Sequence, residues 1–263
     1  MTKTRNVFVI GAEPFNMERL TKLPAAEHCR FYSALDLEEI RHIDAFDMET
    51  IIAESMISGS QCTLEGYVFE GEVIGYGIVD SVREGDRSSF SRYEYPSSLP
   101  LDVQFRMIEI ARRVVSQLDL DDSPFNMEFF YNQTHDHIFI LEINPRISLA
   151  HVDMFEKVHG YSHQQVMVDI ALGHRPAPME RQGAYQVSAN FMLRVFEDGI
   201  VTRVPTAAEI EAVRARFPGA DFKILVHEGD QLSFLEGQDS YSYEVANIFL
   251  GAATRVELLD RYD

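Results

Sequence analysis

The stretch that most constrains the fold of this chain runs from residue 125 to residue 151 and is typical of a β-hairpin. Phe125–Tyr131 and His137–Ile143 are rich in aromatic and branched residues, and Asn132–Asp136 between them is a polar turn. Two such arms pair as antiparallel strands, and successive side chains of each strand point to opposite faces. The sequence therefore predicts an antiparallel sheet that contains this hairpin.

Acidic and amide side chains interrupt both arms of the hairpin, at positions where a buried sheet would favour apolar residues. Glu128 lies in the first arm, and Glu142 and Asn144 lie two residues apart at the end of the second arm, on one face. Because the turn is centred near Thr134, Glu128 and Glu142 fall at nearly opposed positions. Opposed carboxylates repel each other unless a cation lies between them, and oxygen-only ligands suit Mg²⁺ or Mn²⁺ better than zinc. The hairpin therefore predicts a metal site.

Arg146 follows just after the second arm and could hold phosphate or carboxylate oxygens in a bidentate fork. Two other interpretations of the hairpin stay open. The acids could be solvated on a surface hairpin, or Glu128 and Glu142 could be the acid pair of a glycosidase, although Asn144 and Arg146 favour metal and phosphate. His151 lies close behind, and we favour a packing or capping role for it, although its place next to the site leaves a catalytic base as the alternative.

Composition narrows the classes of partner. The 23 Lys and Arg against 42 Asp and Glu give a formal charge of −19, which argues against binding to nucleic acid or to an anionic membrane. No apolar run is long enough for a signal peptide or a membrane span. The two cysteines are too few for a disulfide framework and favour a reducing compartment. We therefore expect a cytoplasmic protein of one large domain or two ordinary ones.

Two further segments carry candidate site residues. Glu65 interrupts an otherwise apolar strand, Gln61–Phe69, which pairs with Glu72–Val82 through a tight turn. It is either a site residue or an outward-facing residue of an alternating strand. Arg83–Ser98 is predicted to be a polar loop whose three arginines either receive phosphates or an acidic substrate, or form surface ion pairs.

The remaining elements follow from periodicity and from cap residues. Helices are predicted over Pro14–Leu23, Leu35–Ile43, Leu101–Leu118, Val152–Gly160, Ser162–Leu172, Ala207–Phe217 and Arg255–Tyr262. Strands are predicted over Asn6–Gly11, Arg30–Tyr32, Ile51–Ala53, Tyr185–Phe196, Asp221–Val226 and Ser240–Leu250.

The order of these features resembles the second half of the ATP-grasp catalytic domain. The pattern is a strand, the sequence E-x-M-I-x-G, a strand with an internal Glu, an Arg-rich loop, an amphipathic helix, and then F-N-x-E followed by L-E-x-N-x-R. It is most similar to the branch that includes biotin carboxylase, carbamoyl-phosphate synthase and carboxylate–amine ligases. The resemblance covers about Ile51–Gly173. It implies an α+β fold in which residues 49–177 form the C-terminal lobe of an ATP-grasp domain, an antiparallel sheet with flanking helices. Residues 1–48 would be a partial βαβ-like unit of a preceding domain, and residues 178–263 an accessory α/β domain.

The resemblance implies a role for each matching residue. Glu128, Glu142 and Asn144 would hold Mg²⁺ (or Mn²⁺) that bridges the ATP phosphates, and Arg146 would steady the substrate carboxylate or the transferring phosphoryl group. The hinge that binds adenine would comprise Glu54, Met56 and Ile57, and the residue near the phosphates or the ribose would be Glu65. The implied partners are ATP and a small carboxylate, and a homodimer is compatible with the resemblance. The implied reaction is formation of an acyl phosphate, followed by attack of an amine or a similar nucleophile.

The chain departs from the family pattern at two places. Ala150 stands where biotin carboxylases carry a catalytic acid, which disfavours biotin carboxylation. No lysine lies between Lys22 and Lys157, so the lysine-bearing and glycine-rich ATP subdomain that the family carries before the hinge is expected to be absent, with the discontinuity at about Asp44–Ile51. Two interpretations follow: a ligase of this family whose activity is weak or lost in a shortened chain, or a non-catalytic metal-binding or interaction module.

The absence of these lysines makes a prediction about nucleotide affinity. Without cations to hold the triphosphate against the acidic hairpin, the chain should bind MgATP with millimolar affinity or undetectably. Calorimetric titration measures this directly. Micromolar binding that is lost in Glu142→Ala would contradict the prediction.

Overall fold

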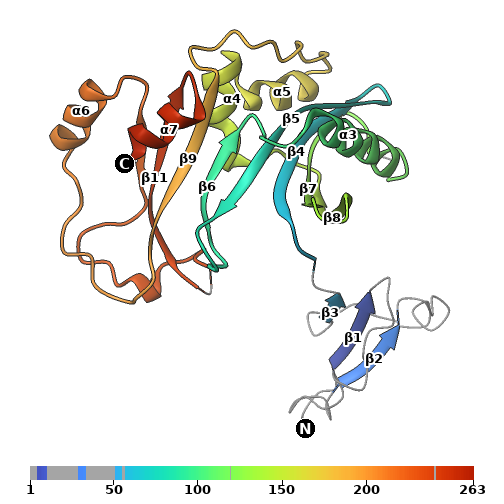
Figure 1. Cartoon of the computed structure of the whole chain (residues 1–263), viewed down its shortest axis with the longest axis horizontal. Helices are drawn as coiled ribbons and strands as arrows, with labels where there is room; N and C mark the ends of the chain where they lie inside the picture. Colours follow the sequence, from blue (N-terminus) through green and yellow to red (C-terminus); the bar gives the residue numbers. More distant parts are fainter. Residues whose placement is uncertain (1–4, 11–28, 34–50, 55–56, 119, 240) are drawn as a thin grey trace. The chain divides into compact units, whose positions relative to one another are not determined.

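The computed structural model describes residues 5–10, 29–33, 51–54, 57–118, 120–239 and 241–263. The chain divides into two compact units, Met1–Ile57 and Ser58–Asp263, and each is described by itself (Figure 1). Among the described residues, no helix is long and apolar enough to cross a membrane.

The first unit contains a three-stranded parallel sheet in the order β2-β1-β3. Its strands are β1 (Arg5–Ile10), β2 (Cys29–Ser33) and β3 (Ile51–Glu54), which confirms the three strands predicted here. Parallel neighbours need a crossover connection, as the predicted βαβ-like unit has. The intervening segments, including the helices predicted over 14–23 and 35–43 and most of the predicted discontinuity at 44–51, lie outside the described residues.

The second unit is built on one eight-stranded sheet in which every neighbouring pair is antiparallel, in the order β10-β11-β9-β6-β5-β4-β7-β8. The strands are β4 (Ser60–Phe69), β5 (Glu72–Arg83), β6 (Phe90–Tyr95), β7 (Ser123–Asn132), β8 (His137–Asn144), β9 (Val187–Val195), β10 (Asp221–Ile224) and β11 (Tyr243–Ala252). With the helices that flank it, this sheet confirms the predicted α+β class with an antiparallel sheet (Figure 1).

Helices lie on both faces of this sheet. Strand β9 shows this, because Ser188 donates a hydrogen bond to the Met154 carbonyl of α4, whereas Phe191, which points to the other face, stacks on Tyr262 of α7. The helices are α3 (Leu101–Val115), α4 (Val152–His159), α5 (His163–Ala171), α6 (Ala207–Arg216) and α7 (Arg255–Tyr262), as predicted to within a few residues. Single-turn 3₁₀ helices cover Leu149–His151 and Leu232–Phe234.

The largest core lies between α3 and the strands β4 and β7. The buried side of α3 repeats at helical spacing and meets alternate residues of the two strands. Met107 of the helix packs with Leu64 of β4 and Met127 of β7, and all three are fully buried. Since Met127 lies between Asn126 and Glu128, this packing directs the two polar side chains to the opposite face of the sheet.

The interpretation of Arg83–Ser98 as a polar loop is wrong in its second half. Phe90–Tyr95 forms strand β6, which pairs with β5 on one side and β9 on the other. Tyr95 is buried among the side chains of α4, and such burial of alternate aromatic residues outweighs the polar composition.

The predicted boundary between residues 49–177 and 178–263 falls between α5 and β9. Strand β9 hydrogen-bonds to β6, so residues from both predicted domains share one sheet and one compact unit. The sheet continues across the boundary because the other edge of β9 pairs with β11, which in turn pairs with β10.

A glycine sets the course of β4 behind the hairpin. The register of β4 against β5 shifts between Glu65 and Gly66. A side chain at Gly66 would bring its Cβ to 2.5 Å from the ring of Phe125 and 2.7 Å from the Ile74 carbonyl oxygen, so only glycine fits. The bulge lets the strand bend at the point where it carries Glu65.

The core under the hairpin supports a stability prediction. Met127→Ala should lower the free energy of unfolding by about 2–5 kcal/mol, because it leaves a cavity between β7 and α3. Met167→Ala is the matched control, since Met167 is 41% exposed on α5 and its loss should cost about 0.5 kcal/mol or less. Denaturant unfolding followed by circular dichroism measures both, and equal losses in the two variants would refute this account of the core.

Candidate functional site

The pairing of β7 with β8 brings the predicted metal ligands together. Glu128 lies directly opposite Glu142, and Asn126 lies directly opposite Asn144. The register shifts only beyond Glu128, towards the turn, so both pairs lie in regular antiparallel geometry on one face. The predicted opposition of the two carboxylates is therefore confirmed.

Polar neighbours hold the two carboxylates in place. Gln61 Nε2 donates a 2.8 Å hydrogen bond to Glu128 Oε2, and Arg83 donates a 2.8 Å hydrogen bond to Gln61 Oε1. On the other strand, Asn144 Nδ2 donates to Glu142 Oε1 at 2.8 Å. Partial burial, and then the nearby charge of Glu142, raise the pKa of Glu128 above its ordinary value, against the bond from Gln61. A cation between the carboxylates would relieve this cost.

The donor set fits a hard divalent cation. Glu128 and Glu142 offer carboxylate oxygens and Asn144 offers an amide oxygen, which are ligands that Mg²⁺ or Mn²⁺ accepts together with water. Within the described ranges, no group of three or more His, Cys, Asp or Glu is arranged to hold a metal ion, so zinc-type sites are not found there.

Arg146 follows β8 and lies at the mouth of this site. Asn126 Nδ2 donates a 2.8 Å hydrogen bond to the Arg146 carbonyl, which fixes the backbone just after the strand. The side chain is exposed, and none of the ion pairs in the described part of the chain involves it. Its guanidinium is therefore free, as far as the described residues go, to pair with an anion.

A small polar cavity of about 140 Å³ lies beside the acidic pair. Most of its walls are polar side chains, and its lining comprises Thr63, Ser81, Phe90, Tyr93, Asn126, Glu128, Asn144, Arg146, Ser148 and His151. The Ser81 hydroxyl is buried and has no hydrogen-bond partner among the described residues. An unsatisfied buried hydroxyl indicates a polar occupant.

Glu65 lies behind this cavity rather than in its wall. The side chain is fully buried, with Oε1 2.7 Å from His151 Nδ1 and Oε2 3.8 Å from His163 Nε2. Burial raises the pKa of Glu65 to about 8, and burial lowers the pKa of His151 to about 3. The sequence interpretation placed Glu65 near the phosphates or the ribose, and its buried position makes direct contact with a ligand in this conformation impossible.

His151 lines the cavity, although the sequence favoured a packing or capping role for it and left a role in the site as the alternative. The available signal was that a histidine and a lone acid in an apolar strand were both unexplained. Their contact joins residues 86 positions apart, and no local pattern reveals such a pair.

The predicted adenine hinge is only partly described. Glu54 ends β3, but its side chain lies outside the described residues, as does Met56. Ile57 is described and half-buried, at the point where the two units divide. The roles of these three residues stay predictions.

The arginines of the segment from 83 to 98 are largely paired. Arg83 donates to the Ser88 carbonyl and to Gln61, and Arg92 donates to Glu94 at 2.6 Å. Arg87 lies 3.7 Å from Glu84 and stacks over Phe196. Local ion pairs and stacking therefore account for these charges better than a phosphate-receiving patch does.

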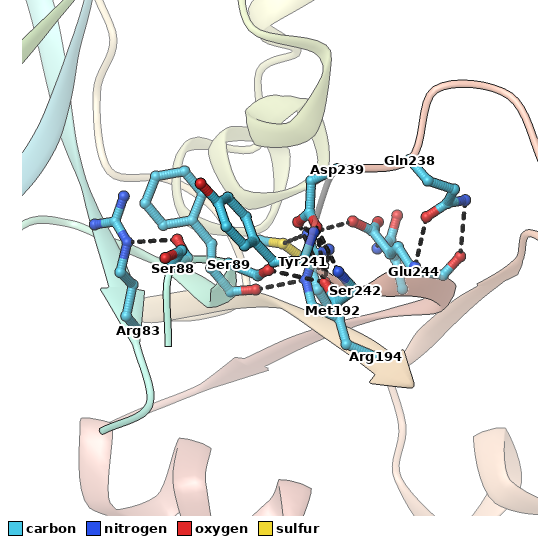
Figure 2. Close-up of polar contacts among 12 residues, drawn as sticks. Arg83, Ser88, Ser89, Met192, Arg194, Gln238, Asp239, Tyr241, Ser242 and Glu244 are labelled. Carbon is cyan, nitrogen blue, oxygen red and sulfur yellow. Dashed lines mark hydrogen bonds and ion pairs between the residues drawn. The ribbon is translucent and has the colours of Figure 1, made fainter. Parts of the chain in front are cut away.

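A separate arginine ties the sheet to the segment before β11. Arg194 of β9 donates hydrogen bonds to the Phe90 carbonyl, Asp239, Ser242 and Glu244, at distances between 2.7 and 2.9 Å (Figure 2). These acceptors are all residues of the protein itself, so the hydrogen bonds of Arg194 hold the two segments together. The cluster borders a second cavity of about 480 Å³.

Comparison with known proteins finds one family model and a set of solved structures that this chain resembles. Residues 78–177 match the family model of the carbamoyl-phosphate synthase L chain, ATP binding domain. No curated protein sequence matches the chain.

Solved structures share the fold at low sequence identity. The L-amino acid ligase from Bacillus licheniformis aligns with a TM-score of 0.62 and 16% identity over 80% of this chain and 52% of that protein. Phosphoribosylglycinamide synthetase from Anaerococcus prevotii aligns with a TM-score of 0.60 and 13% identity over 79% of this chain and 52% of that protein. The biotin carboxylase domain of Hydrogenobacter thermophilus 2-oxoglutarate carboxylase, in complex with MgADP, ADP and bicarbonate, aligns with a TM-score of 0.57 and 17% identity over 80% and 45%.

The chain thus spans about half the length of the solved structures it matches. The eight-stranded antiparallel unit, the acidic hairpin and the family match agree with one another. Residues 78–177 thus match an ATP binding domain, and the chain shares its fold with the three solved structures above.

Proposed function

We propose that the protein is an ATP-dependent ligase that activates a small carboxylate as an acyl phosphate and passes the acyl group to an amine or a similar nucleophile. The observation that carries this proposal is the opposed pair Glu128 and Glu142, with Asn144 beside them and Arg146, which no ion pair of the described residues engages, in the wall of the same cavity. The similar structures supply the reaction class, since they include a ligase and a carboxylase domain with bound MgADP and bicarbonate.

The acidic pair would serve the nucleotide through a cation. Mg²⁺ bound there would neutralise the phosphates of ATP and hold them for transfer. Glu128 and Glu142 would supply carboxylate oxygens and Asn144 its amide oxygen. The hydrogen bond from Gln61 keeps Glu128 oriented towards its partner, so the ligands are positioned before the metal arrives.

Arg146 would bring the second anion to the site. Phosphoryl transfer to a carboxylate brings two negative groups together, so catalysis depends on charge neutralisation and positioning. A free guanidinium next to the acidic pair can hold a carboxylate or phosphoryl oxygens in a bidentate fork. Its exposure at the cavity mouth leaves room for a ligand of either kind.

The proposed reaction has two steps. A carboxylate oxygen attacks the γ-phosphorus of ATP, the bond between that phosphorus and the β–γ bridging oxygen breaks, and ADP leaves. The nucleophile then attacks the acyl carbon, the bond to the phosphate oxygen breaks, and inorganic phosphate leaves with the electron pair. The nucleophile gives up its proton to solvent. We expect weak activity, because the lysines that clamp ATP in the family have no counterpart between Lys22 and Lys157.

The metal site predicts Mn²⁺ binding that does not require ATP. Glu142→Ala should lower the Mn²⁺ affinity at least tenfold, because it removes one of two carboxylates and leaves a single charged ligand. Glu109→Ala, an exposed acid on α3, is the matched control and should bind as the unchanged chain does. Electron paramagnetic resonance of free Mn²⁺ measures the affinity, and equal binding by both variants would rule out the hairpin as the site.

The reaction is tested by release of inorganic phosphate from ATP and Mg²⁺ in the presence of bicarbonate or each of the common amino acids. We expect release that depends on both Mg²⁺ and one carboxylate. Arg146→Ala should slow it by about a hundredfold, the typical effect of losing one positioned donor. Arg113→Ala, an exposed arginine on α3, should not. Absence of carboxylate-dependent release from the unchanged chain would favour the non-catalytic module instead.

A further inference from the structure

A chain of buried polar groups runs from the cavity into the interior. His151 Nδ1 lies 2.7 Å from Glu65 Oε1, Glu65 Oε2 lies 3.8 Å from His163 Nε2, and His163 Nδ1 lies 2.8 Å from the Tyr76 hydroxyl. Glu65 and His163 are fully buried and His151 is 2% exposed. Glu65 Oε2 and His163 Nε2 have no hydrogen-bond partner among the described residues. Buried polar groups usually have hydrogen-bond partners, so this row of buried polar side chains, with two unpartnered atoms, needs an explanation.

The fold holds the outer end of this chain rigidly. His151 ends the one-turn 3₁₀ helix that follows Arg146. The backbone carbonyl of the preceding residue, Ala150, accepts a hydrogen bond from Asn190 Nδ2. The ring of Tyr93 meets the His151 ring edge-on at 4.9 Å between centroids. With Glu65 on Nδ1 and Tyr93 against the ring, the imidazole has one orientation, and it lines the cavity.

The number of protons on the pair decides what His151 offers to that cavity. A buried carboxylate without a cation partner is unfavourable, so the pair Glu65–His151 is held in a neutral state with two protons. Because Glu65 Oε2 lies 3.8 Å from His163 Nε2 and has no hydrogen-bond partner among the described residues, the proton of the pair lies in the short contact, on Glu65 Oε1 or on His151 Nδ1. In both arrangements His151 Nε2 carries the other proton, so the ring presents a hydrogen-bond donor to the cavity.

The cavity suits an anionic group of small size. Arg146 is the cationic residue of its wall, and His151 and the unpartnered Ser81 hydroxyl are donors around it. A volume of about 140 Å³ holds about four or five water molecules at about 30 Å³ each. A carboxylate group with a short stem fits such a volume, and Glu128 bounds it on the metal side.

We propose that His151, oriented by Glu65, is a substrate-binding residue that donates a hydrogen bond from Nε2 to the carboxylate of the acceptor substrate, while Arg146 pairs with the same group. Glu65 is then a positioning residue rather than a ligand of the nucleotide. This inference rests on the proposed function only in naming the carboxylate as the substrate's. The donor, its support and the cavity belong to the described structure.

The first test reads the tautomer directly. In the full chain labelled with ¹⁵N-histidine, with His151 assigned by comparison with His151→Asn, we expect Nε2 to be protonated at pH 7. Glu65→Gln should keep this state, because its amide N–H can donate to Nδ1, whereas Glu65→Leu should lose it. A proton on Nδ1 alone in the unchanged chain would overturn the proposal. Retention of the tautomer in Glu65→Leu would remove Glu65 from it.

The second test uses acetate as the probe carboxylate, with inorganic phosphate and sodium chloride as comparison anions. Acetate should shift the His151 Nε2 signal and bind at least fivefold more weakly to His151→Asn and to Arg146→Ala. A stronger response to phosphate than to acetate would assign the cavity to a phosphoryl group and overturn the carboxylate assignment. Equal acetate affinity in His151→Asn would overturn the role of His151.

The pH dependence of acetate binding gives a readout that a structural role would not change. The groups that face the pair are His163 and Tyr76 on the inner side and Tyr93, Glu128 and Arg146 on the cavity side. Because burial raises the pKa of Glu65 to about 8, the pair keeps two protons below that pH and loses one above it. Nε2 then becomes an acceptor, so acetate affinity should fall as the pH rises through about 8.

In Glu65→Gln this fall should be absent, because glutamine does not titrate, and an unchanged pH profile in that variant would contradict the mechanism. A negative result for the role of His151 can be distinguished from a negative result for the proposed ligase function. The tautomer and acetate measurements need no ATP turnover, and phosphate release needs no particular His151 tautomer.

Discussion

Repulsion between two carboxylates is the constraint on which the site depends. Thr63, Glu128 and Glu142 form one row across β4, β7 and β8, and Glu65, Asn126 and Asn144 form the next row on the same face. Each row places acids where a sheet would otherwise bury apolar side chains. The fold manages the two rows differently, since the outer acids stay near solvent and accept hydrogen bonds from amides, whereas the inner acid is buried against two histidines.

The two rows therefore differ in their chemistry. The outer row sets two carboxylates opposite each other, and burial raises the pKa of Glu128 above its ordinary value, so a cation there would be favourable. The inner row holds Glu65 in a short contact with His151, and burial raises the pKa of Glu65 to about 8, so the pair keeps both of its protons at neutral pH. An acidic pair on β7 and β8, for which we propose a cation, and a buried hydrogen-bonded pair therefore lie side by side. The core beneath, formed by Leu64, Met107 and Met127, keeps the two rows on one face.

Much of the fold could be predicted from local pattern. The hairpin of β7 and β8, the hairpin of β4 and β5 and the five described helices followed from periodicity and turns, because side-chain alternation and helical spacing are properties of neighbouring residues. Strand β6 was missed, since the segment around it is rich in Arg and Ser and its aromatic residues gain their burial only from α4. That β9 joins β6, so that one sheet crosses residue 178, depends on edge pairing that no local pattern encodes.

The sequence by itself determined that Glu142 and Asn144, two residues apart in one strand, share a face, and that Arg146 lies just beyond them. That Glu128 lies opposite Glu142 depends on the register shift between Glu128 and Phe129, because the register next to the turn, where Phe129 pairs with Ile140, would set Glu128 opposite Leu141. Only the tertiary structure decided the fate of Glu65, whose strand pattern was compatible with either face. Its contact with His151 requires β4 and the 3₁₀ turn after β8 to meet, and burial then raises the pKa of Glu65 to about 8. The cavity likewise exists only where the strands from β4 to β8 and that turn come together, since its walls come from residues 63 to 151.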